Sequence, residues 1–200
     1  MEFNIKDRIK PDAKILLIKL RSIGDVVYNT AVYSPIKKHL PNARLTVLVE
    51  SASYEIVKNH PDVDEVLCFK KGSFFEQVKF YLTLIWSRYD VAIDMHEGTR
   101  GAVMCFLSFA RFKIGGKFAR RSFLYNTKIN FSDLKPAIPL DYQVALISKL
   151  GVPFENPQPI IHVSDAWRKS AHDLLISKNF DYEKPYCIIH PGARKYDQWQ

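Results

Sequence analysis

Short apolar runs alternate along this chain with longer amphipathic segments. The runs are rich in Val, Ile and Leu, and they lie at residues 13–20, 44–49, 65–69, 89–95 and 112–116. Runs of this kind are typical of strands buried on both faces of a parallel sheet. The intervening segments have helical spacing, at residues 25–39, 51–60, 73–87 and 99–110. This alternation predicts an α/β fold with a doubly wound, Rossmann-like parallel sheet and helices on both faces.

The helix starts carry recognisable capping signals. Ser73 is followed three residues later by Glu76, which is the spacing of a capping box. Helical spacing returns over 139–150 and stops at Gly151, a residue that suits the end of a helix. A last helix is predicted over 164–178, with Ser164 or Asp165 as its N-cap.

The end of the sequence predicts a second domain that is only begun. Three prolines within 151–160 indicate a linker, and the apolar run at 186–192 is typical of a strand that enters a Pro-Gly turn. A strand and its loop are the start of a structural unit, and a lone strand has nothing to pair with. We therefore expect one domain over residues 1–160. Residues 161–200 would be a linker helix and the first strand and loop of a truncated second α/β domain.

Positive charge is concentrated in the middle of the chain. The net charge is +8, and residues 98–132 contain no Asp or Glu. The basic residues of this window are Arg100, Arg111, Lys113, Lys117, Arg120, Arg121 and Lys128. A field of one sign favours an anionic partner such as nucleic acid, a phosphorylated lipid or a nucleotide, although a solvated basic surface explains it equally well.

Cysteine usage and hydropathy indicate the compartment. Cys68, Cys105 and Cys187 are widely spaced and each lies in an apolar run, which predicts buried thiols in a reducing compartment. The charged N-terminus lacks the apolar core of a signal peptide, and no apolar segment has the length of a transmembrane helix. We expect a cytoplasmic protein, with a role at a membrane surface left open.

The loop RSIGDVV at 21–27 is the first candidate site. Ligands of open α/β sheets bind outside the carboxyl ends of the strands, and Gly24 permits a tight turn and close approach of a ligand. The loop matches neither a dinucleotide fingerprint nor a P-loop. Two interpretations are open: Ser22 or Asp25 only caps the following helix, or Asp25 serves as a general base. A helix N-terminus lowers the pKa of a carboxylate, which keeps it ionised but makes it a weaker base.

Two further loops carry polar groups. In AIDMHEGTRG at 92–101, Arg100 could bind a phosphate, whereas His96 is equally explained as an ordinary polar loop residue. No standard metal-ligand spacing occurs in this loop. In IIHPGARKYDQW at 188–199, the Pro-Gly turn could offer backbone amides to an anion.

Taken together, these stretches resemble glycosyltransferase family 9, the heptosyltransferases of lipopolysaccharide inner-core assembly. The opening ILLIKLRSIGDVV at 15–27 is similar to the start of that family, and the segment from Asp94 to Gly101 is similar to its D-x-x-G-x-x-R-[SG] segment. KIGG at 113–116, FLYN at 123–126 and HPGA at 190–193 also match, in the same order. The resemblance covers nearly all of residues 13–200.

The resemblance implies a GT-B architecture of two Rossmann-like domains, with the acceptor bound by the first and the nucleotide sugar by the second. It implies an inverting, metal-independent transfer of heptose from ADP-heptose, without a cofactor, to Kdo-lipid A or a heptosyl acceptor. Asp25 would be the catalytic base. The acceptor-binding candidates are Ser22, Gly24, His96, Arg100, Arg120 and Arg121, and the donor-binding candidates are His190, Pro191, Gly192, Ala193, Arg194 and Lys195.

Some residues depart from the family pattern. Asp197 stands where a basic residue is common, and an aspartate facing a diphosphate would be unfavourable. Because most of a donor domain is missing, the chain alone is expected to be inactive. Peripheral contact with the inner membrane and a monomeric state are expected, and no nucleic-acid-binding motif is present. The alternatives are a non-catalytic basic α/β binding module and a degenerate family member, either of which would recognise an anionic partner.

Overall fold

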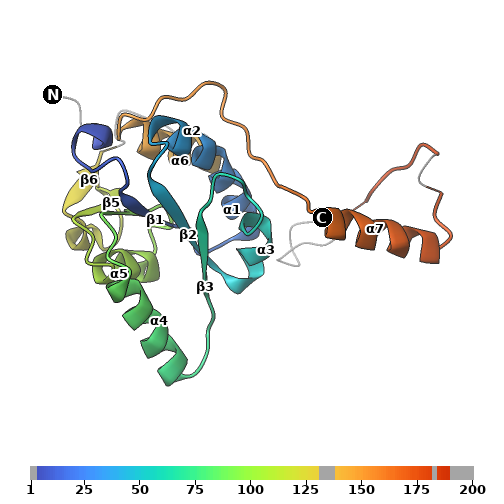
Figure 1. Ribbon diagram of the computed structural model, residues 1–200, viewed down its shortest axis with the longest axis horizontal. Helices are drawn as coiled ribbons and strands as arrows, with labels where there is room; N and C mark the ends of the chain where they lie inside the picture. The colour runs from blue at the N-terminus through green and yellow to red at the C-terminus, as the bar shows by residue number, and fades with distance from the viewer. Residues whose placement is uncertain (1–3, 131–137, 182–183, 190–200) are drawn as a thin grey trace, which may run out of the picture. The chain divides into compact units, whose positions relative to one another are not determined.

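A six-stranded parallel sheet forms the centre of the molecule. The computed structural model describes residues 4–130, 138–181 and 184–189, and Figure 1 shows their arrangement. The strand order is β3-β2-β1-β4-β5-β6, and every neighbouring pair is parallel. The strands are β1 (Lys14–Ile18), β2 (Arg44–Glu50), β3 (Glu65–Phe69), β4 (Val91–Asp94), β5 (Phe112–Gly116) and β6 (Thr127–Ile129). The predicted Rossmann-like sheet is confirmed.

Helices pack against both faces of the sheet. They are α1 (Ile23–Asn29), α2 (Tyr33–His39), α3 (Tyr54–Val57), α4 (Phe74–Trp86), α5 (Thr99–Leu107), α6 (Pro139–Ser148) and α7 (Asp165–Ser177). In the described residues they are supplemented by the 3-10 turns η1 (Ile5–Asp7), η2 (Thr30–Val32), η3 (Ser51–Ser53) and η4 (Ser122–Leu124). Figure 1 shows α1, α2 and α6 on one side of the sheet, with α4 and α5 on the other.

Each face of the sheet has its own hydrophobic core. Ile15 and Leu17 of β1 are buried in the core that includes side chains of α1, α2 and α6. Leu16 and Ile18 point to the opposite core, which includes side chains of α4 and α5. Successive side chains of a strand point to opposite faces, so a strand covered on both faces must be apolar throughout. This is why the strands were recognisable as continuous apolar runs.

Local chemistry explains most helix boundaries. Ser73 caps α4, and the Glu76 carboxylate accepts a hydrogen bond of 2.7 Å from the backbone N–H of Ser73, as the capping box predicts. The helix predicted over 25–39 is instead divided into α1, η2 and α2. Pro35 lies in the first turn of α2, where a backbone N–H is not needed, whereas in one unbroken helix it would leave the carbonyl one turn earlier without a donor.

Residues near the end of the chain differ from expectation. The strand predicted over 186–192 is not formed by residues 186–189, the part that the structure describes. No described segment pairs with it, and unpaired backbone does not make a sheet. Cys187 is exposed, and Cys68 of the edge strand β3 is only partly buried, so the prediction of buried thiols holds for Cys105 alone.

The chain separates into two compact units, residues 1–162 and 163–200. The second unit contains α7, which begins after Ser164 as predicted; the Ser164 hydroxyl accepts a hydrogen bond of 3.2 Å from the Trp167 N–H. That this unit begins a donor-binding domain stays a prediction. Within the described part of the chain, none of the helices combines the length and the apolar character needed to cross a bilayer.

Candidate functional site

The candidate site lies where the chain reverses its direction of winding across the sheet. β1 and β4 are neighbours at the centre, yet the connection from β1 leads to β2 on one side and that from β4 leads to β5 on the other. The loops after β1 and β4 therefore diverge and leave a crevice at the carboxyl ends of the two strands. Asp25 lies in the first turn of α1, the helix that follows β1, and His96 lies in the loop after β4.

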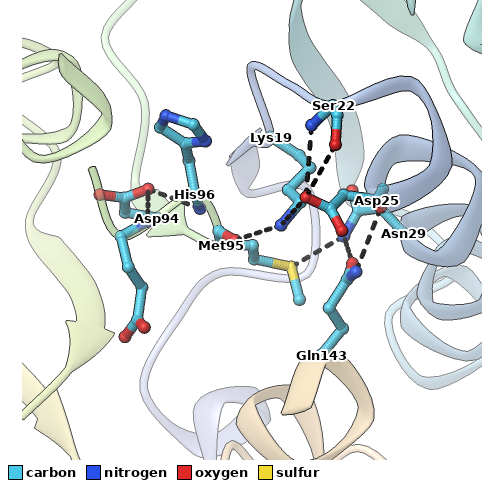
Figure 2. Close-up of polar contacts among 9 residues, drawn as sticks. Lys19, Ser22, Asp25, Asn29, Asp94, Met95, His96 and Gln143 are labelled. Carbon is cyan, nitrogen blue, oxygen red and sulfur yellow. Dashed lines mark hydrogen bonds and ion pairs between the residues drawn. The ribbon is translucent and has the colours of Figure 1, made fainter. Parts of the chain in front are cut away.

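The Asp25 carboxylate is held by the turn that precedes it. Its Oδ2 accepts hydrogen bonds from the Ser22 backbone N–H at 3.3 Å and from the Ser22 hydroxyl at 3.4 Å (Figure 2). The Asp25 side chain remains about one-third exposed. Asp25 therefore stabilises the first turn of α1 and still presents its carboxylate to solvent, so capping does not exclude a role in chemistry.

Lys19 is a member of the site that was not predicted. Its ammonium lies 3.9 Å from Asp25 Oδ2 and donates a 3.0 Å hydrogen bond to the backbone carbonyl of Met95 (Figure 2). Burial lowers the pKa of Lys19, and the negative charge of Asp25 opposes that effect. The only signal in the sequence was one lysine inside the apolar run LLIKL, just before the loop. Lysine is rarely buried without a partner, so such a position was a reason to look for one.

A buried polar network lies beneath Asp25. The Asn29 amide donates to Gln143 Oε1 at 2.5 Å and to Met95 Sδ at 3.2 Å, and its oxygen accepts from the Tyr33 hydroxyl at 3.0 Å. The Gln143 amide in turn donates to the backbone carbonyl of Asp25 at 3.1 Å. Buried polar groups with satisfied partners rigidify a structure, so this network fixes α1 against α6 and sets the position of Asp25.

Asp94 anchors the loop after β4. It is fully buried, and it accepts hydrogen bonds from the Tyr125 hydroxyl at 2.7 Å and from the backbone N–H groups of His96 and Glu97 at 2.9 and 3.2 Å. Burial raises the pKa of Asp94 to about 6, although these bonds oppose the shift. A Cβ on Gly101 would lie 2.5 Å from this carboxylate, so the glycine makes room for it.

His96, Arg100 and Arg120 line one hollow of about 550 Å³. Burial lowers the pKa of His96, and the charges of Lys19 and Arg21 add to that effect. Arg100 forms an ion pair of 2.7 Å with Glu50 and lies over the ring of Phe69, 5.3 Å from its centroid. Arg100 is therefore held in position but partly neutralised.

The other predicted site residues are placed as follows. Arg121 is exposed and is not among the residues that line the hollow. Gly24 lies inside α1 and not in a tight turn; it has no positive φ, and a Cβ there would meet nothing within 4 Å, while close approach of a ligand at Gly24 stays a prediction. The six donor-site candidates, residues 190–195, lie outside the described residues. Within the described part of the chain, no cluster of three His, Cys, Asp or Glu could hold a metal ion.

Known proteins are similar to this chain in sequence. Lipopolysaccharide heptosyltransferase 3 of Escherichia coli K12 is 24% identical over 186 residues, which are 88% of this chain and 53% of that protein. Lipopolysaccharide heptosyltransferase 1 of Campylobacter coli is 26% identical over 189 residues, 90% of this chain and 55% of that protein. The chain thus spans about half the length of the curated relatives it matches.

Solved structures show the same fold. The glycosyl transferase family 9 protein of Veillonella parvula superposes with a TM-score of 0.72 at 19% identity, over 91% of this chain and 52% of the other. E. coli heptosyltransferase WaaC, solved with ADP-2-deoxy-2-fluoro heptose, gives 0.63 at 21% identity, over 73% and 51%. The family model "Glycosyltransferase family 9 (heptosyltransferase)" matches residues 78–199, which is more than half of the sequence. The chain therefore belongs to glycosyltransferase family 9.

Proposed function

We propose that this chain is the acceptor-binding half of an inverting glycosyltransferase that moves a heptose from ADP-heptose to the lipopolysaccharide inner core. The observation that carries the proposal is the Asp25 carboxylate, which is ordered yet partly exposed at the carboxyl end of β1. The two relatives named above are lipopolysaccharide heptosyltransferases, which supports the choice of sugar and acceptor class.

Asp25 is suited to act as the general base. Among the described residues, every hydrogen bond that its carboxylate accepts falls on Oδ2, which is also the oxygen nearer Lys19. Oδ1 is thus left for the acceptor hydroxyl. In the proposed step Oδ1 takes the hydroxyl proton while the acceptor oxygen bonds to the anomeric carbon of the heptose. The bond from that carbon to the diphosphate oxygen breaks on the opposite side, ADP leaves with the electron pair, and the configuration inverts.

The hollow that His96 lines is the proposed site for the anionic groups of the acceptor. Arg21, Arg100 and Arg120 all line it, and guanidinium groups bind phosphates and carboxylates through paired hydrogen bonds. Kdo-lipid A and a heptosyl core both carry such groups. The donor would be held by the second domain, so the 200-residue chain alone would bind acceptor but not turn it over. We place the enzyme in the cytoplasm, as a metal-independent monomer.

The test is transfer of heptose by the product of the complete source gene, with ADP-heptose as donor and Kdo-lipid A as acceptor. We expect Asp25→Asn to keep the fold and to lower kcat by at least about a hundredfold, since general bases contribute rates of that order. Asp12→Asn is the matched control, because Asp12 is exposed and precedes β1 at the other edge of the sheet. Retained transfer by Asp25→Asn would remove Asp25 as the base. No transfer by the unaltered protein would favour a degenerate or purely binding role.

A further inference from the structure

One side of the first unit combines exposed aromatic rings with positive charge. We call it the α4–α5 face and define it as the solvent-facing side of residues 70–88 and 98–124, which contain α4, α5 and η4. These helices cover the core formed by Leu16 and Ile18, on the side of the sheet away from α1, α2 and α6 (Figure 1). Neither the fold nor the candidate catalytic site requires the outer surface of these helices to be apolar.

The aromatic side chains are strongly exposed. In α4, Phe74, Val78, Leu82 and Trp86 recur at every fourth position and form a stripe along the helix, and Phe74 and Trp86 are 74% and 73% exposed. Other exposed rings on the face are Phe75, Phe106, Phe109, Phe118 and Phe123. Among the described residues of the first unit, every exposed Phe and Trp lies on this face. Large exposed apolar patches mark sites of contact with a partner or a membrane.

The same face holds the excess charge of the molecule. Its two segments contain ten lysines and arginines and one acidic residue, Glu76, whereas the whole chain has a net charge of +8. The remaining residues are therefore close to neutral. Lys70, Lys71, Lys79 and Arg88 are all exposed beside the α4 stripe, and within the described residues no ion pair neutralises them.

We propose that the α4–α5 face docks on an anionic phospholipid bilayer. Aromatic rings enter the headgroup region of a bilayer, and lysines and arginines are attracted to anionic lipids at its surface. Single-stranded nucleic acid is a weaker match, because such sites combine a basic groove with stacked aromatics, whereas these rings project from the outside of helices. Charge complementarity thus selects a negatively charged lipid surface rather than an uncharged partner.

This face adjoins the proposed acceptor site. Tyr81 of α4, Val103 of α5 and Arg120 before η4 all contribute to the hollow beside His96. A docked enzyme would therefore hold the hollow close to the bilayer surface, where the headgroup of a lipid-anchored acceptor is found. The link between docking and the acceptor rests on the proposed function. Lipid binding itself can be measured without any transfer of heptose.

The test is flotation of the complete chain with vesicles of phosphatidylcholine, with or without phosphatidylglycerol. We expect binding only when phosphatidylglycerol is present, and weaker binding at high salt. Lys70→Gln with Lys71→Gln should weaken binding about fivefold for each lysine. Phe75→Ser with Trp86→Ser should weaken it at least tenfold, since both rings would otherwise be buried in lipid.

Matched controls distinguish binding through the α4–α5 face from nonspecific adsorption of the protein to vesicles. Lys10→Gln with Lys38→Gln removes two exposed lysines from elsewhere in the first unit, and Leu174→Ser removes an exposed apolar side chain from α7. These variants should float like the unaltered chain, and so should Asp25→Asn, which tests only the transfer. The proposal is overturned if the chain does not float, if it floats equally with neutral vesicles, or if the face variants float as well as the controls. Oligonucleotide binding without vesicle binding would assign the face to nucleic acid instead.

Discussion

The ammonium of Lys19 lies 3.9 Å from Asp25 Oδ2, directly after the apolar residues 15–18 of β1. Lys19 also bonds to the carbonyl of Met95, so a single buried cation joins the loop after β1 to the loop after β4. Its positive charge and the Ser22 bonds act on the same carboxylate oxygen. The arrangement leaves Oδ1 accessible and fixes the orientation of the carboxylate relative to the crevice.

Replacing Lys19 should therefore affect transfer more than stability. We expect Lys19→Met to lower kcat about tenfold to a hundredfold with little change in KM, because a misoriented base affects the chemical step more than acceptor binding. The free energy of unfolding should change by less than about 1 kcal/mol, since the cost of burying the ammonium offsets much of what its partners provide. Steady-state kinetics and urea unfolding measure the two effects.

Lys19→Arg is the matched control for this prediction. It keeps the positive charge beside Asp25 and should restore part of kcat, whereas a purely structural role of Lys19 would appear as an equal loss of stability in both variants. A change in KM alone would place Lys19 in acceptor binding and contradict a role in positioning the base.

Much of the fold was predictable because its determinants are local. The strands are buried on both faces, so each is a continuous apolar run, and the α4 cap is encoded by Ser73 and Glu76 alone. β6 was missed because three residues, Thr127–Ile129, are too few for a periodic pattern. The division of the first predicted helix depends on Pro35, whose missing backbone N–H does not alter the helical spacing of the apolar residues around it.

The candidate site was only partly predictable because its contacts are remote in sequence. Ser22 and Asp25 are three residues apart, and their relationship follows from the rules of helix capping. Asn29 and Gln143 meet across 114 residues, and neither has a local feature that identifies its partner. Lys19 carried a weak signal, an isolated charge in an apolar run, but its contact with Met95 depends on strand order. The donor-site candidates, residues 190–195, lie outside the described residues, so their role stays a prediction.

Asp94 should make stability fall as the pH rises through about 6. Its folded pKa of about 6 lies above its ordinary value of 3.8, so the folded state binds the proton more tightly than the unfolded state. That stabilisation is complete below the unfolded pKa and is lost as the pH rises through the folded pKa, with a span of about 3 kcal/mol. Asp94→Asn cannot titrate. The free energy of unfolding of Asp94→Asn minus that of the unaltered chain should therefore increase by up to about 3 kcal/mol between about pH 4 and pH 7.

Urea unfolding at several pH values tests this prediction. Parallel pH curves for the variant and the unaltered chain would show that Asp94 does not titrate in this range. Asp12→Asn is a suitable control, since Asp12 is exposed and precedes β1, at the edge of the sheet opposite to Asp94.

His60 should have the opposite effect on stability. Burial is the main cause that lowers its pKa to about 4 from 6.5, and its ring packs edge-on against Tyr33 and His162 at centroid distances of 5.1 and 4.8 Å. The unfolded state therefore binds the proton more tightly, and stability is lost as the pH falls from about 6.5 toward 4. His60→Phe keeps a ring in place and should remove this loss, about 3 kcal/mol over that interval.

The effects of Asp94 and His60 oppose each other between about pH 4 and pH 6, so the unaltered chain should show a shallow dependence there. Each single variant should reveal the slope of the residue that remains. If His60→Phe and the unaltered chain have the same dependence of stability on pH in this range, His60 does not contribute to it.

Two glycines of the site should respond differently to alanine. A Cβ on Gly101 would lie 2.5 Å from Asp94 Oδ1, so Gly101→Ala must displace a buried carboxylate, and we expect a loss of about 1–3 kcal/mol in the free energy of unfolding. A Cβ on Gly24 would meet nothing within 4 Å, and Ala is the better helix former, so Gly24→Ala should gain up to about 1 kcal/mol.

Activity then distinguishes the two roles that were considered for Gly24. If the acceptor approaches the backbone at this point, Gly24→Ala should raise the KM for acceptor although the protein is more stable, because the methyl group occupies space that the substrate needs. An unchanged KM in the stabilised variant would remove Gly24 from the acceptor site. The structure shows no steric need for glycine at this position, so the KM of Gly24→Ala tests directly whether the acceptor contacts the backbone here.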